Sequence, residues 1–89
     1  MIMAKGACWY RTCPNCDGQG RLLILEDTTH NRLYLHCEEC EMGWLRPEES
    51  GDPSKGFLTL NQNFETSTPS LDRIRELGWS GYAKHRINE

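Results

Sequence analysis

Two short apolar runs with a polar stretch between them dominate the hydrophobic pattern of the chain. Residues 21–26 read RLLILE, residues 32–36 read RLYLH, and DTTHN separates the two runs. Apolar runs of this length around a polar tip predict a β-hairpin. Residues 8–12, CWYRT, are short and aromatic, so we expect an extended segment there that leads into the hairpin.

The sequence after the hairpin changes to turn-forming residues. Residues 46–56 read RPEESGDPSKG, with two prolines, two glycines and several charges, which predicts a loop. The apolar FLTL at residues 57–60 predicts a further short strand, and NQNFETS at residues 61–67 predicts a return to loop.

The last predicted element is a short helix within residues 68–79, TPSLDRIRELGW. Thr68 is suited to cap it, with Pro69 at the first helical position, where a missing N–H costs nothing. Gly78 is suited to end it in the left-handed conformation. Three apolar residues at spacing i, i+3 and i+6 predict the face that packs on the sheet, namely Leu71, Ile74 and Leu77.

Four cysteines flank the predicted hairpin in two pairs, in the pattern Cys13-x2-Cys16-x20-Cys37-x2-Cys40. Each CxxC turn places two thiolates on one side, and the hairpin brings the two turns together. The pattern therefore predicts one Zn²⁺ ion per chain, held tetrahedrally by four sulfurs. Four protein ligands leave no position for an activated water, so we expect the zinc to be structural rather than catalytic.

Soluble, cytoplasmic protein is the expected class. No apolar run approaches the roughly 20 residues that span a bilayer, and MIMAKGACWY at the start lacks the features of a secretory signal. The reducing cytoplasm disfavours disulfides, and the chain has five cysteines, an odd number. A redox-active CxxC would open a helix, whereas Asp-Gly-Gln-Gly after Cys16 favours a turn.

Three other residues have side chains that bind zinc in proteins. Cys8 lies outside the spacing of the two pairs and is expected to be a small buried residue. His30 lies at the predicted hairpin tip, where we expect it to be solvated. His36 precedes Cys37 on a predicted strand, so its side chain should point to the opposite face.

Charge is unevenly distributed around the formal net charge of −3. Residues 73–86 are weakly basic, whereas residues 38–52 contain a single cation, Arg46, among six acidic residues: Glu38, Glu39, Glu41, Glu48, Glu49 and Asp52. The acidic run is either a solvated rim or a docking face for a basic protein partner. A nucleic-acid binder usually shows a basic stripe, so no nucleic-acid partner is expected. No group of residues supports catalysis, and we expect a non-enzymatic protein.

Residues 13–20, CPNCDGQG, resemble the CxxCxGxG repeat of DnaJ-type co-chaperones. The second cysteine pair lacks the GxG ending, and the chain has neither further repeats nor a J-domain, so this likeness is local. A wider resemblance is to a group of small bacterial zinc-ribbon proteins. It rests on these residues: Cys13, Pro14, Cys16, Leu33, Tyr34, Leu35, Cys37, Glu39, Cys40, Trp44, Pro47, Glu48, Gly78, Trp79 and Tyr82.

The wider resemblance implies a role in toxin neutralisation, because proteins of this group are often immunity proteins of polymorphic or contact-dependent toxin systems. The expected fold is a small α+β domain, a β-rich zinc ribbon with one short C-terminal helix. Residues 1–89 should form one domain, with the ribbon at 7–47, a loop and short strand at 48–67, and the helix and GWxxY tail at 68–89. We expect a monomer that binds a basic toxin domain. The alternative is an accessory module of nucleic-acid, transcription or translation complexes.

Overall fold

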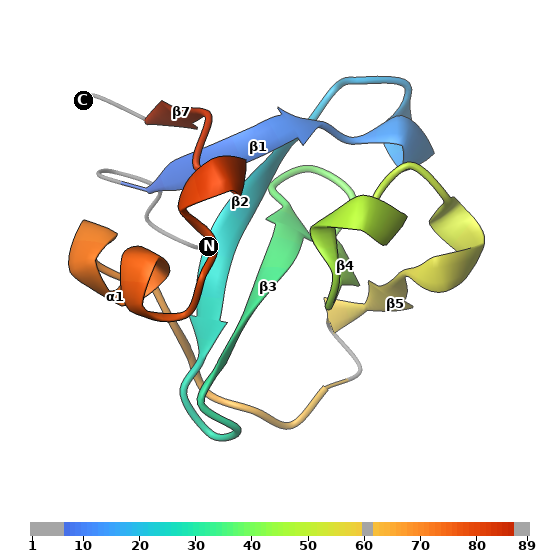
Figure 1. The fold of residues 1–89 in the computed structure, drawn as a ribbon. Helices are drawn as coiled ribbons and strands as arrows, with labels where there is room; N and C mark the ends of the chain where they lie inside the picture. The colour runs from blue at the N-terminus through green and yellow to red at the C-terminus, as the bar shows by residue number, and fades with distance from the viewer. Residues whose placement is uncertain (1–6, 60–61, 87–89) are drawn as a thin grey trace.

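Antiparallel strands form most of the regular secondary structure of the described residues, and one short α-helix packs against them (Figure 1). The computed structural model describes residues 7–59 and 62–86. Its strands are β1 (Cys8–Thr12), β2 (Arg21–Asp27), β3 (Arg32–Cys37), β4 (Met42–Trp44), β5 (Phe57–Leu58), β6 (Thr66–Ser67) and β7 (His85–Arg86). The sheet order is β5-β4-β3-β2-β1-β7, and β6 pairs with the end of β2. An antiparallel sheet with one short helix was the coarse expectation, and it is confirmed.

The predicted hairpin is present as β2 and β3. Their register runs from Leu22 opposite Cys37 to Asp27 opposite Arg32, so both cysteine pairs lie at the same end of the hairpin. Asn31 turns the chain at the other end with a φ of 53°, a left-handed conformation that asparagine tolerates well. The hairpin therefore brings the CxxC motifs together, as the sequence pattern predicts.

Asp27 fixes the tip of the hairpin. Its buried carboxylate accepts hydrogen bonds from the His30 backbone N–H (3.1 Å) and from Arg32 Nε (2.9 Å), and its Oδ2 lies 2.7 Å from His30 Nδ1. Burial acts to raise the pKa of Asp27, but the hydrogen bonds from His30 and Arg32 lower it below its usual value. His30 is half exposed, as expected at a tip, yet it is held by this carboxylate rather than fully solvated.

Several short strands complete the sheet. β4, β6 and β7 were not predicted, because two or three residues are too few to show a periodicity. The strand expected at residues 57–60 is shorter: β5 covers Phe57–Leu58, and residue 60 lies outside the described residues. The loop expected at residues 46–56 contains two 3₁₀ turns, Pro47–Glu49 and Pro53–Lys55. The sheet thus takes strands from all three segments into which the sequence divides.

Side chains alternate between two packed faces of the sheet. One face carries the larger core, in which the fully buried Trp44 packs with β2, β3 and helix residues, namely Leu22, Ile24, Leu33, Leu35 and Ile74. Tyr34 on the other face packs with Leu23 and Leu25 beneath the rings of Phe57 and Phe64. Both faces of β2 and β3 are covered, which explains why RLLIL is apolar at every position after the arginine.

The helix α1 (Leu71–Glu76) covers part of the first face (Figure 1). The sequence placed its cap at Thr68, but the cap is Ser70, whose hydroxyl accepts a hydrogen bond from the Arg73 N–H (3.1 Å). Gly78 ends the helix with a φ of 80°, as predicted. The Trp79 N–H then bonds to the Ile74 carbonyl (2.9 Å), a Schellman arrangement that turns Trp79 back toward the core.

The predicted packing face of the helix is only partly correct. Ile74 is buried and Leu77 is partly buried, but Leu71 is 46 % exposed.

Within the described residues, no helix is long and apolar enough to cross a membrane.

Candidate metal centre

Two tight turns present the four cysteines. The first is a 3₁₀ turn, η1 (Pro14–Cys16), that starts with a proline and is followed by Asp17 and Gly18 at φ values of 54° and 79°. The loop around it is closed by a hydrogen bond from the Cys13 N–H to the Gly20 carbonyl (2.8 Å). The second turn follows β3, where the N–H groups of Glu39 and Cys40 both point at Cys37 Sγ (3.4 Å each). N–H groups aimed at sulfur stabilise thiolate charge.

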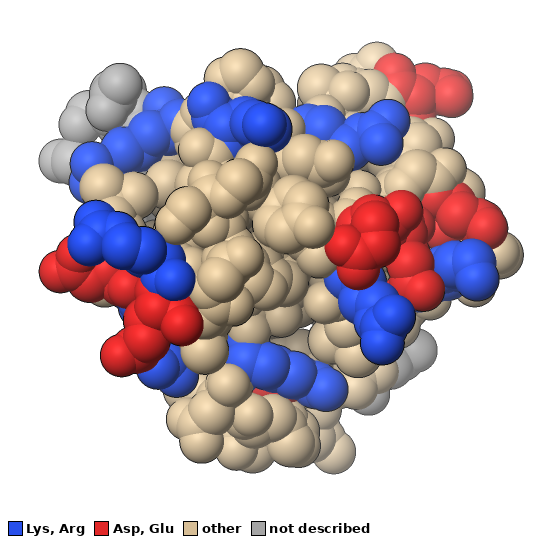
Figure 2. Space-filling view, viewed as in Figure 1, with Lys and Arg blue, Asp and Glu red and all other residues tan. Residues whose placement is uncertain are grey.

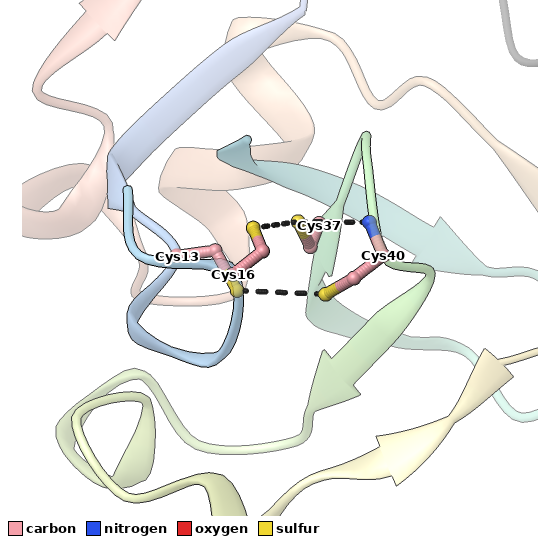
Figure 3. A group of neighbouring side chains, drawn as sticks. All are labelled: Cys13, Cys16, Cys37 and Cys40. Carbon is pink, nitrogen blue, oxygen red and sulfur yellow. Dashed lines mark hydrogen bonds between the residues drawn. The ribbon is translucent and has the colours of Figure 1, made fainter. Parts of the chain in front are cut away.

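The four sulfur atoms face one another between these turns (Figure 3). All lie within 4.8 Å of one another, with Cys13 Sγ 3.7 Å from Cys40 Sγ and Cys16 Sγ 3.6 Å from Cys37 Sγ. Sulfurs 2.3 Å from a central zinc in a regular tetrahedron are about 3.8 Å apart. The separations also exceed the roughly 2.05 Å of a disulfide, and all five cysteines are free thiols. The cluster can therefore hold a metal ion.

Without a cation, the electrostatics of the cluster disfavour four thiolates held together. Burial raises the pKa of the Cys13 and Cys37 thiols, because a buried thiolate loses its hydration. Burial acts on Cys40 in the same direction, but hydrogen bonds from the Asn15 side chain (3.5 Å) and from the Met42 backbone lower its pKa overall. Thiolates held this close repel one another, and a divalent cation would reverse that repulsion.

Gly20 makes room for the cluster. A β-carbon at this position would lie 2.5 Å from Cys37 Sγ and 3.0 Å from the β-carbon of Glu39. Backbone therefore approaches Cys37 Sγ more closely than any side chain would allow. This contact gives a physical reason for the second glycine of CPNCDGQG.

Gly20→Ala should weaken metal binding about 10- to 100-fold, as changes next to metal ligands commonly do. The added methyl group must displace Cys37 Sγ or the second turn, and either shift distorts the tetrahedron. Competition with a chromophoric chelator would measure the affinity. Gly81→Ala is the matched control, because a β-carbon there meets no atom within 4 Å. Equal affinities for the two variants would contradict this account of Gly20.

The other candidate ligands lie outside the cluster. Cys8 is buried in the core, and among the described residues only the four cysteines form a group that can hold a metal. His36 points to the opposite face, as predicted, with Nε2 3.2 Å from Glu41 Oε2. Burial lowers the pKa of His36, and its Nδ1 is buried without a hydrogen-bond partner in the part of the chain that the structure describes.

Some acidic residues of the predicted rim form ion pairs or hydrogen bonds with neighbouring described residues, and others do not. Glu38 forms a bidentate pair with the Arg21 guanidinium and also accepts from the Arg21 backbone N–H (3.1 Å). Continuing the hairpin register by one pair places these two residues opposite each other, so this pair could be read from the predicted hairpin.

The remaining acidic residues differ in their contacts. Glu41 lies near His36, Asp52 accepts from the Ser54 N–H (3.0 Å), and Glu48 accepts from the Tyr82 hydroxyl (3.1 Å). Glu39 is exposed, and neither it nor Glu49 has an ion-pair partner among the described residues. Figure 2 shows acidic side chains to the right of the face it presents, with basic ones among them, and a second acidic group at the left.

Comparison with known proteins gave no relative: no protein family, no curated protein and no solved structure matches this chain.

Proposed function

We propose that the chain is a zinc ribbon whose four cysteines bind one structural Zn²⁺ ion. Sulfur separations of 3.6 and 3.7 Å across the two turns support this assignment, since they approach those of a tetrahedral thiolate site. The soft, four-sulfur donor set also selects zinc over magnesium or calcium, which prefer oxygen. When bound, the ion links the two turns and neutralises the thiolates.

On this basis we propose a non-enzymatic binding protein, specifically a monomeric, cytoplasmic immunity protein that neutralises a basic toxin domain by direct contact. The closed four-thiol cluster carries the proposal, because a metal site without an open position serves folding and not chemistry. The exposed acidic side chains of Glu39, Glu48 and Asp52, on or just after the second turn, supply charge complementary to a basic partner.

The first test is whether the protein protects cells that express a basic toxin encoded next to it. The second is how charge reversal alters binding.

Glu39→Lys combined with Glu48→Lys should slow association with that toxin about tenfold at low salt, with a smaller effect on dissociation. Glu65→Lys is the control, since it makes the same charge change at an exposed site beside the hairpin tip. Surface plasmon resonance at two salt concentrations would measure both rates. A neighbourhood and a pull-down without any toxin-like partner would refute the role.

One observation favours the alternative role in nucleic-acid complexes. The register of β1 with β7 brings the basic tail alongside β1, so that Arg11, Lys84 and Arg86 lie along one edge of the sheet. Figure 2 shows lysine and arginine side chains in a row over β1 and β7. The stacked rings of Trp9 and His85 (4.2 Å) lie at the same edge.

Fluorescence anisotropy with short single-stranded RNA and duplex DNA would decide between the two roles. Submicromolar binding that weakens steeply with salt, and that Arg11→Glu abolishes, would favour the alternative. Weak binding at physiological salt, unchanged by Arg11→Glu, would leave the protein-binding role.

A further inference from the structure

A groove of about 320 Å³ opens between the sheet and the end of the helix. Residues 31–33, at the start of β3, form one side, and residues 45–46, just after β4, form another. The floor and third side are apolar, made by these four residues: Leu33, Leu45, Leu77 and Trp79. Figure 2 shows an uncharged face in this region, with basic side chains below it and both basic and acidic side chains to its right.

The groove lies where the pairing of two neighbouring strands, β3 and β4, ends. The pairing of β3 with β4 ends at Leu35 opposite Trp44, so the first residues of β3 pair with β2 alone in the described register. The Schellman turn holds Trp79 from the other side, and the Tyr82 ring packs edge-on against the Trp79 ring (5.7 Å). The groove is thus built from positioned elements.

The polar groups at the groove are mainly hydrogen-bond donors. Arg46 is exposed and forms no ion pair with the described residues, whereas Arg32 is anchored through Nε to Asp27. Asn31 is the remaining polar residue, and no carboxylate of the described residues lines the groove. In a chain of net charge −3, this surface is locally positive beside an apolar floor.

We propose that this groove binds a short segment of a partner protein in which a leucine or phenylalanine is flanked by aspartate or glutamate. The apolar side chain would cover Leu33, Leu45 and Leu77, and a carboxylate would pair with Arg46. The volume lies near the lower end of the roughly 300–1,000 Å³ typical of ligand pockets, which suits one or two side chains. The inference rests on the proposed protein-binding role, but it does not require a toxin as the partner.

The observations favour a peptide over a nucleic acid. Three of the four apolar side chains are leucines, and Trp79 is only partly exposed, so the groove offers little aromatic surface for stacking bases. Glu48 and Glu49 lie two and three residues after Arg46, and their charges would repel a continuing phosphate backbone more than a short peptide with one or two carboxylates.

The test is an NMR titration of the zinc-loaded, full-length protein with capped pentapeptides that carry a central leucine or phenylalanine between aspartate and glutamate residues. These peptides should shift the Trp79 indole N–H signal saturably, and affinity should fall as salt rises. Arg46→Glu should weaken binding at least about tenfold, since it replaces a charge-assisted hydrogen bond by repulsion. Arg75→Glu, a matched reversal on the exposed face of α1, should leave affinity unchanged.

A second matched pair tests the apolar floor. Leu45 and Leu71 are similarly exposed (41 % and 46 %), but only Leu45 lines the groove, so Leu45→Ser should weaken binding while Leu71→Ser should not. The proposal is overturned if no acidic peptide gives a saturable shift. It is also overturned if lysine-flanked peptides or an RNA oligonucleotide bind there more tightly than the acidic peptides. A shift of the Trp79 indole signal on dilution alone would overturn it too, because a second copy of this chain would then occupy the groove.

The outcome separates this proposal from the immunity role. The titration contains no toxin, so a negative result would not contradict protection against a toxin or toxin binding through the acidic rim. Saturable peptide binding in a protein that protects against no toxin would support the groove and remove the immunity role.

Discussion

A chain in which serine replaces Cys13 should lose its metal and fail to reach the native fold. Binding of structural zinc to small domains is worth about 10–16 kcal/mol near neutral pH, comparable with the roughly 5–15 kcal/mol that stabilises a typical whole domain. The domain is small, and its two cysteine turns contact each other through the sulfur cluster. Removing one ligand therefore removes much of the free energy that holds the first turn against the second.

Metal analysis and circular dichroism would measure this effect together. The wild-type protein should carry close to one zinc per chain and should lose structure when a strong chelator is added. Cys8→Ala is the control, because Cys8 is buried in the core and lies outside the cluster. That variant should keep its zinc and lose only about 1 kcal/mol of stability, as for a small buried truncation. Zinc lost from Cys8→Ala, or retained at full affinity by Cys13→Ser, would show that the ligands are wrongly assigned.

The sequence predicted the hairpin and the cysteine cluster because both depend on local patterns. Two apolar runs around a polar tip determine the hairpin. One CxxC precedes its first strand and the other begins at the end of its second strand, so antiparallel pairing brings both turns to one end. The short strands β6 and β7 depend instead on pairing between distant segments, for example Glu26 with Ser67 and Trp9 with His85. Such pairing leaves no periodic signal in two residues.

The groove could not be predicted for a related reason. Its lining comes from three parts of the chain: residues 31–33, residues 45–46, and the pair Leu77 and Trp79. These parts meet only because the β3–β4 pairing and the helix both end beside them. The sequence does contain one relevant signal, an arginine alone among acidic residues at position 46. Taken by itself, that arginine appears as an exception to the acidic run, and only the structure places it beside apolar side chains.

The helix illustrates how a correct pattern gave one wrong position. Successive residues of an α-helix are rotated by about 100°, so a residue at i+6 lies about 120° around the helix from residue i. Leu71, Ile74 and Leu77 therefore form a stripe that drifts across the helix, with Ile74 at its centre. The sheet and Trp79 lie on the side of Leu77, which buries Ile74 and leaves Leu71 exposed.

Ile74→Ala should consequently lower the free energy of unfolding by about 2–4 kcal/mol, whereas Leu71→Ala should change it by no more than about 0.5 kcal/mol. Ile74 is 2 % exposed and packs in the same cluster as Trp44, so truncation leaves a cavity that the sheet cannot close. Leu71 contributes little buried area to lose.

Chemical denaturation of both variants in excess zinc would measure the difference without interference from metal loss. At about 4–8 °C per kcal/mol for a domain of this size, Ile74→Ala should also melt roughly 10–30 °C below the wild type. Equal midpoints for the two variants would show that α1 does not pack on the sheet in solution. In that case Trp79, which the helix terminus holds in place, would lose its support, and the groove beside it would lose its third side.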